Sequence, residues 1–381
     1  MAVLYFTGFE TGDASELSSL GAGFSIDSAV KQSGSYALKG EGDYAELLAV
    51  VGLSLASVWA RMYIRPSGVP ASPAGAPGGI VLRHATDAEV YTSIATASGT
   101  GARTIQLVHR TGGGDVNLGS AWPIALNEWT RLEVKCVIST TVGIAEMALN
   151  GVVVETHTGL NTGSAPIVSL SCAMGNDVVG VANIVHHFDD IQVNDAAYPG
   201  SGRIIGRQVK AGTPTYNAWT KTGGATIDGV WSETPYSAAL NAVSAGASQA
   251  QTGLVVDVAA GLNPIDVNDT INACRVMCVA NRESAGSAYS AYSLRRRVSA
   301  ADTDEAMSFA SLDADLFHQG SIFTATRTAL QSAEMGAVVG TGGGGREDLT
   351  IHDIWLMVDY TPAPKPKAII VPQAAHRASY F

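Results

Sequence analysis

Residues 57–66 read SVWARMYIRP, and their character alternates with a period of two. Successive side chains of an extended chain point to opposite faces of the strand. One face is therefore uniformly apolar and carries Val58, Ala60, Met62 and Ile64. The opposite face is mixed and carries Trp59, Arg61, Tyr63 and Arg65. This pattern predicts a β-strand with one face in a core.

The same pattern continues on the C-terminal side of this stretch. Short runs rich in Val, Ile, Tyr, Trp and Thr recur in TIQLVHR (104–110), EWTRLEVKCVIS (128–139) and IAEMALNGVVVETH (144–157). Asn150 and Gly151 separate two apolar runs, which is a strong hairpin signal because both central residues of a type I′ turn need a positive φ. With 42 glycines and almost no helical periodicity, the chain is predicted to be all-β, with two antiparallel β-sandwich (jelly-roll-like) domains and an extended C-terminal arm.

The length of 381 residues exceeds one ordinary core, which favours two domains. A turn-rich stretch, HHFDDIQVNDAAYPGSG (186–202), places the boundary near residue 199. We expect a concanavalin A/laminin-G-like sandwich over 1–199, a second sandwich over 200–361 and the arm over 362–381. LTIHDIWLMVDYTP (349–362) is predicted to be a strand buried on both faces. One short helix is expected in 325–339, with Leu330, Ala333 and Met335 on its apolar side and Gly336 at its end.

The composition excludes several classes of function. The formal net charge is −11, with 46% hydrophobic and 15% charged residues, and an acidic body repels phosphate backbones, so we expect no nucleic-acid partner. The N-terminus lacks the pattern of a signal peptide, and no stretch approaches the ~18 apolar residues of a membrane helix. The four cysteines, too few and scattered for a disulfide framework, are expected to be buried free thiols of a protein folded in a reducing cytoplasm: Cys136, Cys172, Cys274 and Cys278.

The cluster HHFDD (186–190) could supply metal ligands. In an ideal strand His187 and Asp189 share one face, while His186, Phe188 and Asp190 share the other, so neither face offers three ligands. We therefore interpret the aspartates as turn residues that hydrogen-bond backbone amides. A calcium site that uses Asp189 or Asp190 is the alternative, since Ca²⁺ prefers oxygen ligands from loops. No other cofactor is expected.

No catalytic residue is expected, and the chain is interpreted as a non-enzyme. Neither a G-x-S-x-G elbow nor a phosphate loop occurs, and the glycine run 340–348 is interpreted as a hairpin loop. A β-sandwich glycosidase needs two carboxylates about 5–9 Å apart on one face, yet Glu128 and Glu133 fall on opposite faces and Glu146 is alone on its strand. Trp122 and Trp129 could stack on a sugar; packing at the edge of the sandwich is the alternative.

An ordered set of short motifs resembles a known family. The motifs are YFTGFETGD (5–13), SGSYALKG (33–40), WARMYIR (59–65), EWTRLEV (128–134), LNGVVV (149–154) and FDDIQVND (188–195). Over residues 3–195 the chain is similar to the concanavalin A/laminin-G-like jelly rolls of tailed-bacteriophage structural proteins. Residues 203–361 look like a second domain common in such proteins. The resemblance implies a virion component, either a capsid-decorating protein or a fibre-like head or tail appendage, in which trimers are usual, and it implies no catalytic residues.

The last segment, TPAPKPKAIIVPQAAHRASYF (361–381), contains three basic residues and no acid. Its prolines favour the extended polyproline II conformation, which leaves little chain entropy to lose on docking. The apolar triplet could then add as an edge strand to a neighbour, while the basic side chains meet an acidic surface. The predicted docking residues are Pro362, Pro364, Lys365, Pro366, Lys367, Ile369, Ile370, Val371, Arg377, Tyr380 and Phe381.

These observations lead to a function hypothesis with two alternatives. The leading hypothesis is a non-enzymatic bacteriophage virion structural protein, folded in the host cytoplasm, that docks through its arm onto capsid, neck or tail subunits and forms a homo-oligomer, with a trimer favoured. The first alternative is a glycan-binding adhesion module that recognises a host-surface polysaccharide. The second is a glycosidase or lyase on the same fold. No membrane insertion is expected, and fold alone does not decide among these functions.

Overall fold

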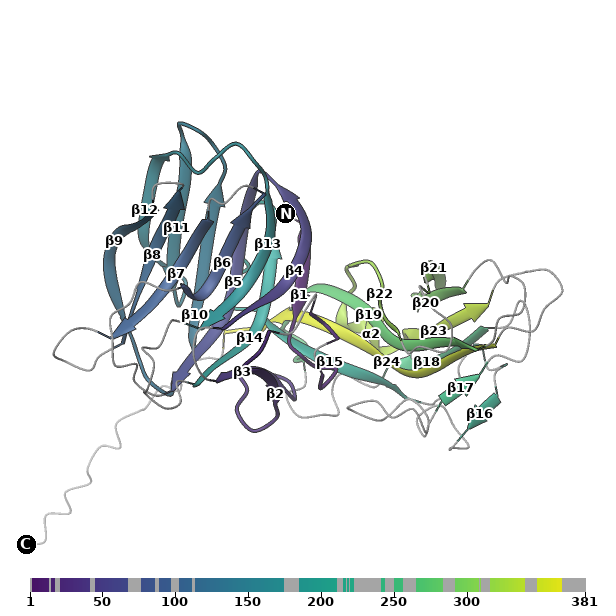
Figure 1. Cartoon of the computed structure of the whole chain (residues 1–381). Coiled ribbons are helices and arrows are strands. Elements are labelled where there is room, and N and C mark those ends of the chain that lie inside the picture. Colours follow the sequence, from purple (N-terminus) through teal and green to yellow (C-terminus); the bar gives the residue numbers. More distant parts are fainter. Residues whose placement is uncertain are drawn as a thin grey trace, which may run out of the picture.

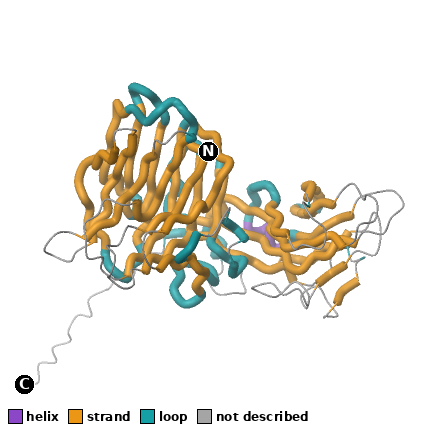
Figure 2. Tube along the Cα trace, viewed as in Figure 1, coloured by secondary structure: helices purple, strands orange, loops and turns teal. Residues whose placement is uncertain are grey.

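The fold was obtained as a computed structural model, and it consists almost entirely of antiparallel strands (Figures 1 and 2). The structure describes residues 2–364 except 14, 18–20, 42–44, 68–76, 86–88, 97–102, 112–113, 175–184, 211–214, 217, 219, 223–240, 244–249, 256–264, 284–291, 308, 310–315 and 340–347. Figure 1 shows two units side by side, with the N-terminal strand at their junction. The predicted all-β fold class is confirmed.

The first unit is a sandwich of two antiparallel sheets. One sheet contains β1 (Val3–Thr7), β2 (Phe24–Asp27), β3 (Ala37–Glu41), β5 (Ser57–Ser67), β10 (Thr130–Val137), β11 (Gly143–Leu149), β12 (Val152–Leu160) and β14 (Val185–Asn194). Its order is β12-β11-β10-β5-β14-β3-β2, and β1 pairs with β14. The other sheet contains β4 (Ala45–Leu55), β6 (Pro77–His84), β7 (Glu89–Thr96), β8 (Arg103–Thr111), β9 (Gly114–Ile124) and β13 (Ile167–Met174). Its order is β4-β13-β6-β7-β8-β9.

The core of this sandwich is formed by the face that the alternation of β5 predicts. Val58, Ala60, Met62 and Ile64 are fully buried in one apolar cluster with residues from both sheets. Asn150 and Gly151 connect β11 to β12 with φ values of 52° and 84°, so the predicted two-residue hairpin is confirmed. The four cysteines are free and buried, as expected.

The second unit is built around two long strands. Its elements are β15 (Arg203–Lys210), β16 (Thr220–Thr222), β17 (Asn241–Val243), β18 (Ala250–Val255), β19 (Thr270–Glu283), β20 (Tyr292–Val298), β21 (Ala301–Met307), β22 (Leu316–Gln319), α2 (Arg327–Gln331), β23 (Glu334–Val339) and β24 (Asp348–Thr361). The ladder runs β16-β17-β24-β15-β18-β23-β20-β21, and β19 pairs with β22 and β24. Strand β15 pairs with β24 through residues 203–208 and with β18 through residues 209–210, so it connects the two layers of the unit.

The predicted helix is shorter than expected. Thr326 caps α2 by accepting a hydrogen bond at Oγ1 from the amide of Ala329 at 3.1 Å, and the helix ends at Gln331. Met335 and Gly336 belong instead to β23, where they pair with β18 and β20. The apolar spacing misled the prediction because a strand between two partners is also apolar, and tertiary pairing outweighs local propensity.

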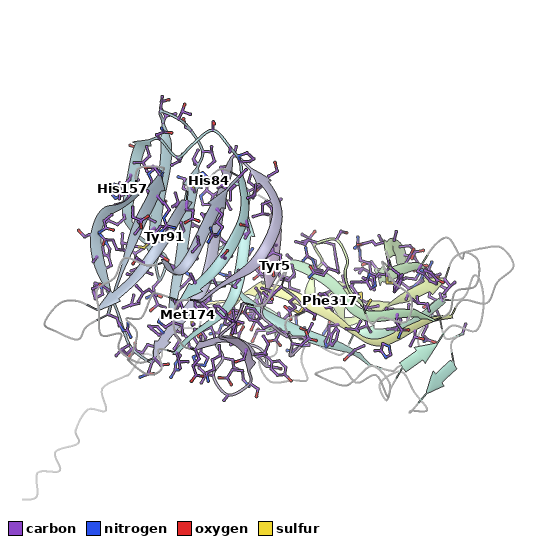
Figure 3. All side chains as sticks on the ribbon, viewed as in Figure 1. Tyr5, His84, Tyr91, His157, Met174 and Phe317 are labelled. Atoms are coloured by element: carbon purple, nitrogen blue, oxygen red, sulfur yellow. The ribbon has the colours of Figure 1, made fainter. Side chains whose placement is uncertain are left out.

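Strand β24 is buried on both faces, as predicted, and each face has its own partner. Ile351, Ile354, Leu356 and Val358 belong to the core of the second unit. Trp355 and Met357 belong to a separate cluster that also contains Phe6 of β1 and Ile204 of β15. The two sandwiches are therefore joined by an apolar core of their own, and Figure 3 labels Tyr5 of β1 at this junction.

Candidate functional site

The structure concentrates buried polar groups where the two sandwiches meet. Arg61 lies on the outer face of β5 and is fully buried. Its Nε donates to the carbonyl oxygen of Asp190 at 3.0 Å, its Nη1 donates to that of Gly200 at 3.3 Å, and its Nη2 lies 3.5 Å from Asp359 Oδ1 on β24. One guanidinium thus links the first sandwich, the connecting segment and the second sandwich.

Asp189 and Asp190 both bind backbone amides, as the interpretation expected. Asp189 Oδ2 accepts hydrogen bonds from the amides of Gln32 and Ser33 at 2.8 and 3.2 Å. Asp190 Oδ1 accepts from the amide of Ile204 at 2.6 Å and lies 2.7 Å from Ser33 Oγ. The two carboxyls therefore fasten the loop before β3 and the start of β15.

The predicted division of faces in HHFDD is wrong at Asp190. Its φ is 50°, and the pairing of β14 with β5 shifts register between Asp189 and Gln192. Such a bulge re-aims the side chains that follow it. Phe188, which precedes the bulge, points into the core. Asp190, at the bulge, does not share this face and instead contacts Ser33, which also contacts Asp189.

No metal-binding group of three or more His, Cys, Asp or Glu side chains is found among the described residues. His187 does not join the aspartates, because its Nε2 lies 3.0 Å from Asp27 Oδ2. His186 is buried, and burial lowers its pKa to about 3, so it is neutral. The hydrogen bonds of both aspartates to backbone amides are structural contacts.

The N-terminal segment contributes two further buried acids to the junction. Glu10 accepts from the amides of Ser35, at 2.8 Å, and of Gly206, at 3.2 Å. It fits closely, because a Cβ on Gly206 would lie 2.5 Å from the Cβ of Glu10. Glu16 accepts from Thr7 Oγ1 and from the amides of Phe9 and Thr11, at 3.1 and 2.7 Å. Sequence reasoning did not single out these glutamates, although both lie in or beside the motif YFTGFETGD.

The acids considered for catalysis are engaged in structural contacts. Glu133 pairs with Arg131 at 3.1 Å and accepts from the amide of Gly200 at 3.0 Å. Glu146 accepts from the hydroxyl of Tyr198 at 2.8 Å. Together they hold the connecting segment against the outer face of the first sheet. The structure does not assign either of them to a reacting position.

The two tryptophans considered for sugar binding are both half-buried. Trp122 lies on the edge strand β9, packs against the core and donates from Nε1 to Glu155 Oε1 at 2.8 Å. Trp129 immediately precedes β10, which lies between β11 and β5 in its sheet. The acceptor on Glu155 could not be anticipated, because β9 and β12 are distant in sequence.

The predicted docking arm begins at the junction. Strand β24 ends at Thr361, and the amide of Ala363 donates to Asp269 Oδ1 at 2.8 Å. Pro362 and Pro364 are described and lie outside any strand. The remaining predicted arm residues, from Lys365 onward, lie outside the described residues. No helix in the described part of the chain is long and apolar enough to cross a membrane.

A comparison with protein-family profiles finds no match, and neither does one with curated protein sequences. Among solved structures, the chain is similar to the cellulose-induced protein Cip1, with 17% identity, a TM-score of 0.34 and coverage of 51% of this chain and 98% of that one. It is also similar to domain 4 of AbnA, an extracellular arabinanase from Geobacillus stearothermophilus in complex with arabinotriose, with 11% identity, a TM-score of 0.35 and coverage of 51% and 93%.

A third similar structure is the binding domain of Paraclostridial mosquitocidal protein 1, with 12% identity, a TM-score of 0.36 and coverage of 66% of this chain and 64% of that one. All three TM-scores are below 0.5, so these likenesses carry no argument about this chain.

Proposed function

We propose that this chain is a non-enzymatic structural protein of a bacteriophage virion, fastened to neighbouring subunits through its C-terminal arm. The observation that carries the proposal is the attachment of the arm to β24. This strand is central in its unit, paired with β15 on one side and with β19 on the other. The arm therefore continues from one of the most thoroughly anchored strands of the molecule.

This attachment suits a segment that is under mechanical tension in an assembly. Tension on the arm acts along β24, and the backbone hydrogen bonds of both ladders resist it together. One face of β24 also packs against the cluster shared with β1, so tension reaches both sandwiches. The basic residues of the arm and the acidic net charge of −11 provide electrostatic attraction between copies or to other acidic subunits.

The proposed oligomer is a homotrimer, docked on capsid, neck or tail subunits. Deletion of residues 365–381 tests this role. The hydrogen bond of Ala363 to Asp269 remains in that variant, so the body is expected to fold as before. We expect the shortened chain to be monomeric in light scattering and to be absent from purified particles, whereas the full chain forms trimers and is incorporated.

Two matched variants locate the contact within the arm. Replacement of Ile369, Ile370 and Val371 by serine removes the apolar triplet. We expect this variant to be monomeric and absent from particles, like the deletion variant. Serine at Ala368, Ala374 and Ala375 alters the same segment without touching a predicted docking residue, and is expected to leave assembly unchanged. Normal incorporation of the deletion variant would refute the docking role of the arm.

Glycan binding remains the second candidate, and one observation favours it. The indole of Trp122 is fixed on an exposed edge strand by its hydrogen bond to Glu155, and a fixed aromatic ring is suited to stacking on a sugar. A glycan array with the full chain and with Trp122→Ala tests this candidate. Binding that depends on Trp122 supports it, and an absence of binding on host-surface polysaccharides removes it.

A further inference from the structure

Five buried carboxyl groups gather at the junction of the two sandwiches. They come from the N-terminal segment, from β14 and from β24, and each is at most 4% exposed: Glu10, Glu16, Asp189, Asp190 and Asp359. Three of them are fully buried, and Arg61 contacts the last two of these: Asp189, Asp190 and Asp359. A single guanidinium cannot balance three negative charges in a site of low polarity.

The contacts of Ser33 indicate where a proton resides. Ser33 Oγ lies 2.9 Å from the carbonyl oxygen of Ile204, which can only accept, and 2.7 Å from Asp190 Oδ1. A serine hydroxyl carries one proton. Both contacts are therefore full hydrogen bonds only when Asp190 is protonated and donates to Ser33, which then donates to Ile204.

Two oxygen atoms of the cluster have no hydrogen-bond partner within the described part of the chain. They are Oδ2 of Asp190 and Oδ2 of Asp359, both buried. An ionised carboxylate needs hydrogen bonds at both oxygens to compensate for the loss of water, whereas a protonated carboxyl needs fewer. The geometry around Asp190 and Asp359 thus favours the protonated carboxyl over the ionised carboxylate.

Other charged and titratable groups face this cluster from every neighbouring element. Tyr63 on β5 faces Asp190, and Glu10 in the N-terminal segment faces Asp189. On β15, Arg207 faces Glu10, and both Arg203 and Arg207 face Tyr360. The remaining neighbours are Arg131 and Glu133 on β10, Cys274 on β19 and Tyr360 on β24. Arg275 on β19 faces Glu16.

Burial is the main cause of the altered titration of these acids. It raises the pKa of Asp190 to about 6, and Arg61 opposes this increase. It raises the pKa of Glu10 to about 8 in spite of the backbone amides that favour the carboxylate. Burial and the nearby Asp190 raise the pKa of Asp189 as well. A carboxyl whose pKa is raised by folding stabilises the folded state at low pH, and this stabilisation is lost as the pH rises through the folded value.

We propose that the junction is a proton-dependent latch, in which protonated buried carboxyls keep the two sandwiches fastened and their ionisation loosens the contact. The latch is closed at about pH 4 and weakens as the pH rises. The stabilisation from Asp190 is lost as the pH rises to its pKa of about 6, and that from Glu10 as the pH rises to its pKa of about 8. Loosening separates the start of β15 from the loop before β3, because Asp190 and Ser33 bridge these segments. The inference does not depend on the proposed virion role.

Amide hydrogen exchange of the full chain between about pH 4 and 8.5, a range that spans the unfolded and folded pKa values of both acids, tests the latch. The reporter peptides cover residues 28–36 and 200–207, which contain the amides of Gln32, Ser33, Ile204 and Gly206. Peptides from residues 103–111 of β8, in the other sheet of the first sandwich, serve as the reference for the intrinsic effect of pH on exchange. We expect protection of the reporters, relative to the reference, to fall by about tenfold or more, with a ceiling of roughly a hundredfold from Asp190 alone.

The variant Asp190→Asn distinguishes the effect of Asp190 ionisation from a general loss of protection at high pH. Asparagine keeps an acceptor for the amide of Ile204 but cannot ionise, so the response of the reporters below about pH 6 is expected to flatten, whereas the response due to Glu10 remains at higher pH. Asp304→Asn, on the remote β21, is the matched control and should keep the response of the unmodified chain. A constant ratio of reporter to reference exchange in the unmodified chain, or loosening on acidification, overturns the proposal even if the Asp190 variant does not fold.

Discussion

Replacing Arg61 by methionine is expected to lower the free energy of unfolding by about 3–5 kcal/mol at pH 8, because it leaves buried negative charge without a counter-ion. Methionine retains much of the aliphatic stem but supplies none of the three contacts with Asp190, Gly200 and Asp359. Urea denaturation followed by tryptophan fluorescence measures the loss. The deficit should be smaller at pH 5, since burial raises the pKa of Asp359 and protonation removes the stranded charge.

Two comparisons make this prediction specific. Arg65→Met changes the same residue type on the same face of the same strand, but Arg65 is only half-buried, so its cost should stay below about 1 kcal/mol. Adding Asp359→Asn to Arg61→Met removes a stranded charge and should recover part of the loss at pH 8. Equal costs for Arg61 and Arg65, or a double variant less stable than Arg61→Met, would contradict the assigned role of the pair.

The faces of β5 could be predicted from the sequence, whereas the burial of Arg61 could not. Alternation with a period of two is a local property, so Val58, Ala60, Met62 and Ile64 are recognisable as a core face without any knowledge of their partners. The outer face of a strand is ordinarily exposed to solvent on an antiparallel sheet. Arg61 is covered by residues 139 and 298 positions away in sequence, and no local pattern encodes such contacts.

The same limit applies to β24 and to HHFDD. The uniformly apolar composition of β24 predicts burial on both faces, but it does not say that β1 of the other sandwich covers one of them. In HHFDD, residue types suggested that the aspartates bind amides, and they do. The bulge at Asp190 lies outside any periodic pattern, so its face was predicted wrongly. The docking role of the arm stays a prediction, since residues from Lys365 onward lie outside the described residues.

The second large effect is expected from Trp355→Ala. Trp355 is 1% exposed and lies in the apolar cluster between the sandwiches with Phe6, Ile204 and Met357. Truncation of a buried tryptophan removes its transfer free energy and leaves a cavity, which together cost about 3–5 kcal/mol. Because this cluster joins the two units, we also expect the unfolding curve to separate into two transitions, with the second unit unfolding first.

A second substitution at this interface tests whether the cluster acts as one core. Phe6→Ala removes the aromatic side chain contributed by β1, and its effect should be less than additive with Trp355→Ala because both enlarge the same cavity. Val267→Ala, at a position 73% exposed in the second unit, is the control and should change stability by less than about 0.5 kcal/mol. Strictly additive losses of stability, together with a single unfolding transition in the double variant, would contradict this role of the cluster. The charged contacts around Arg61 would then be what holds the two units together.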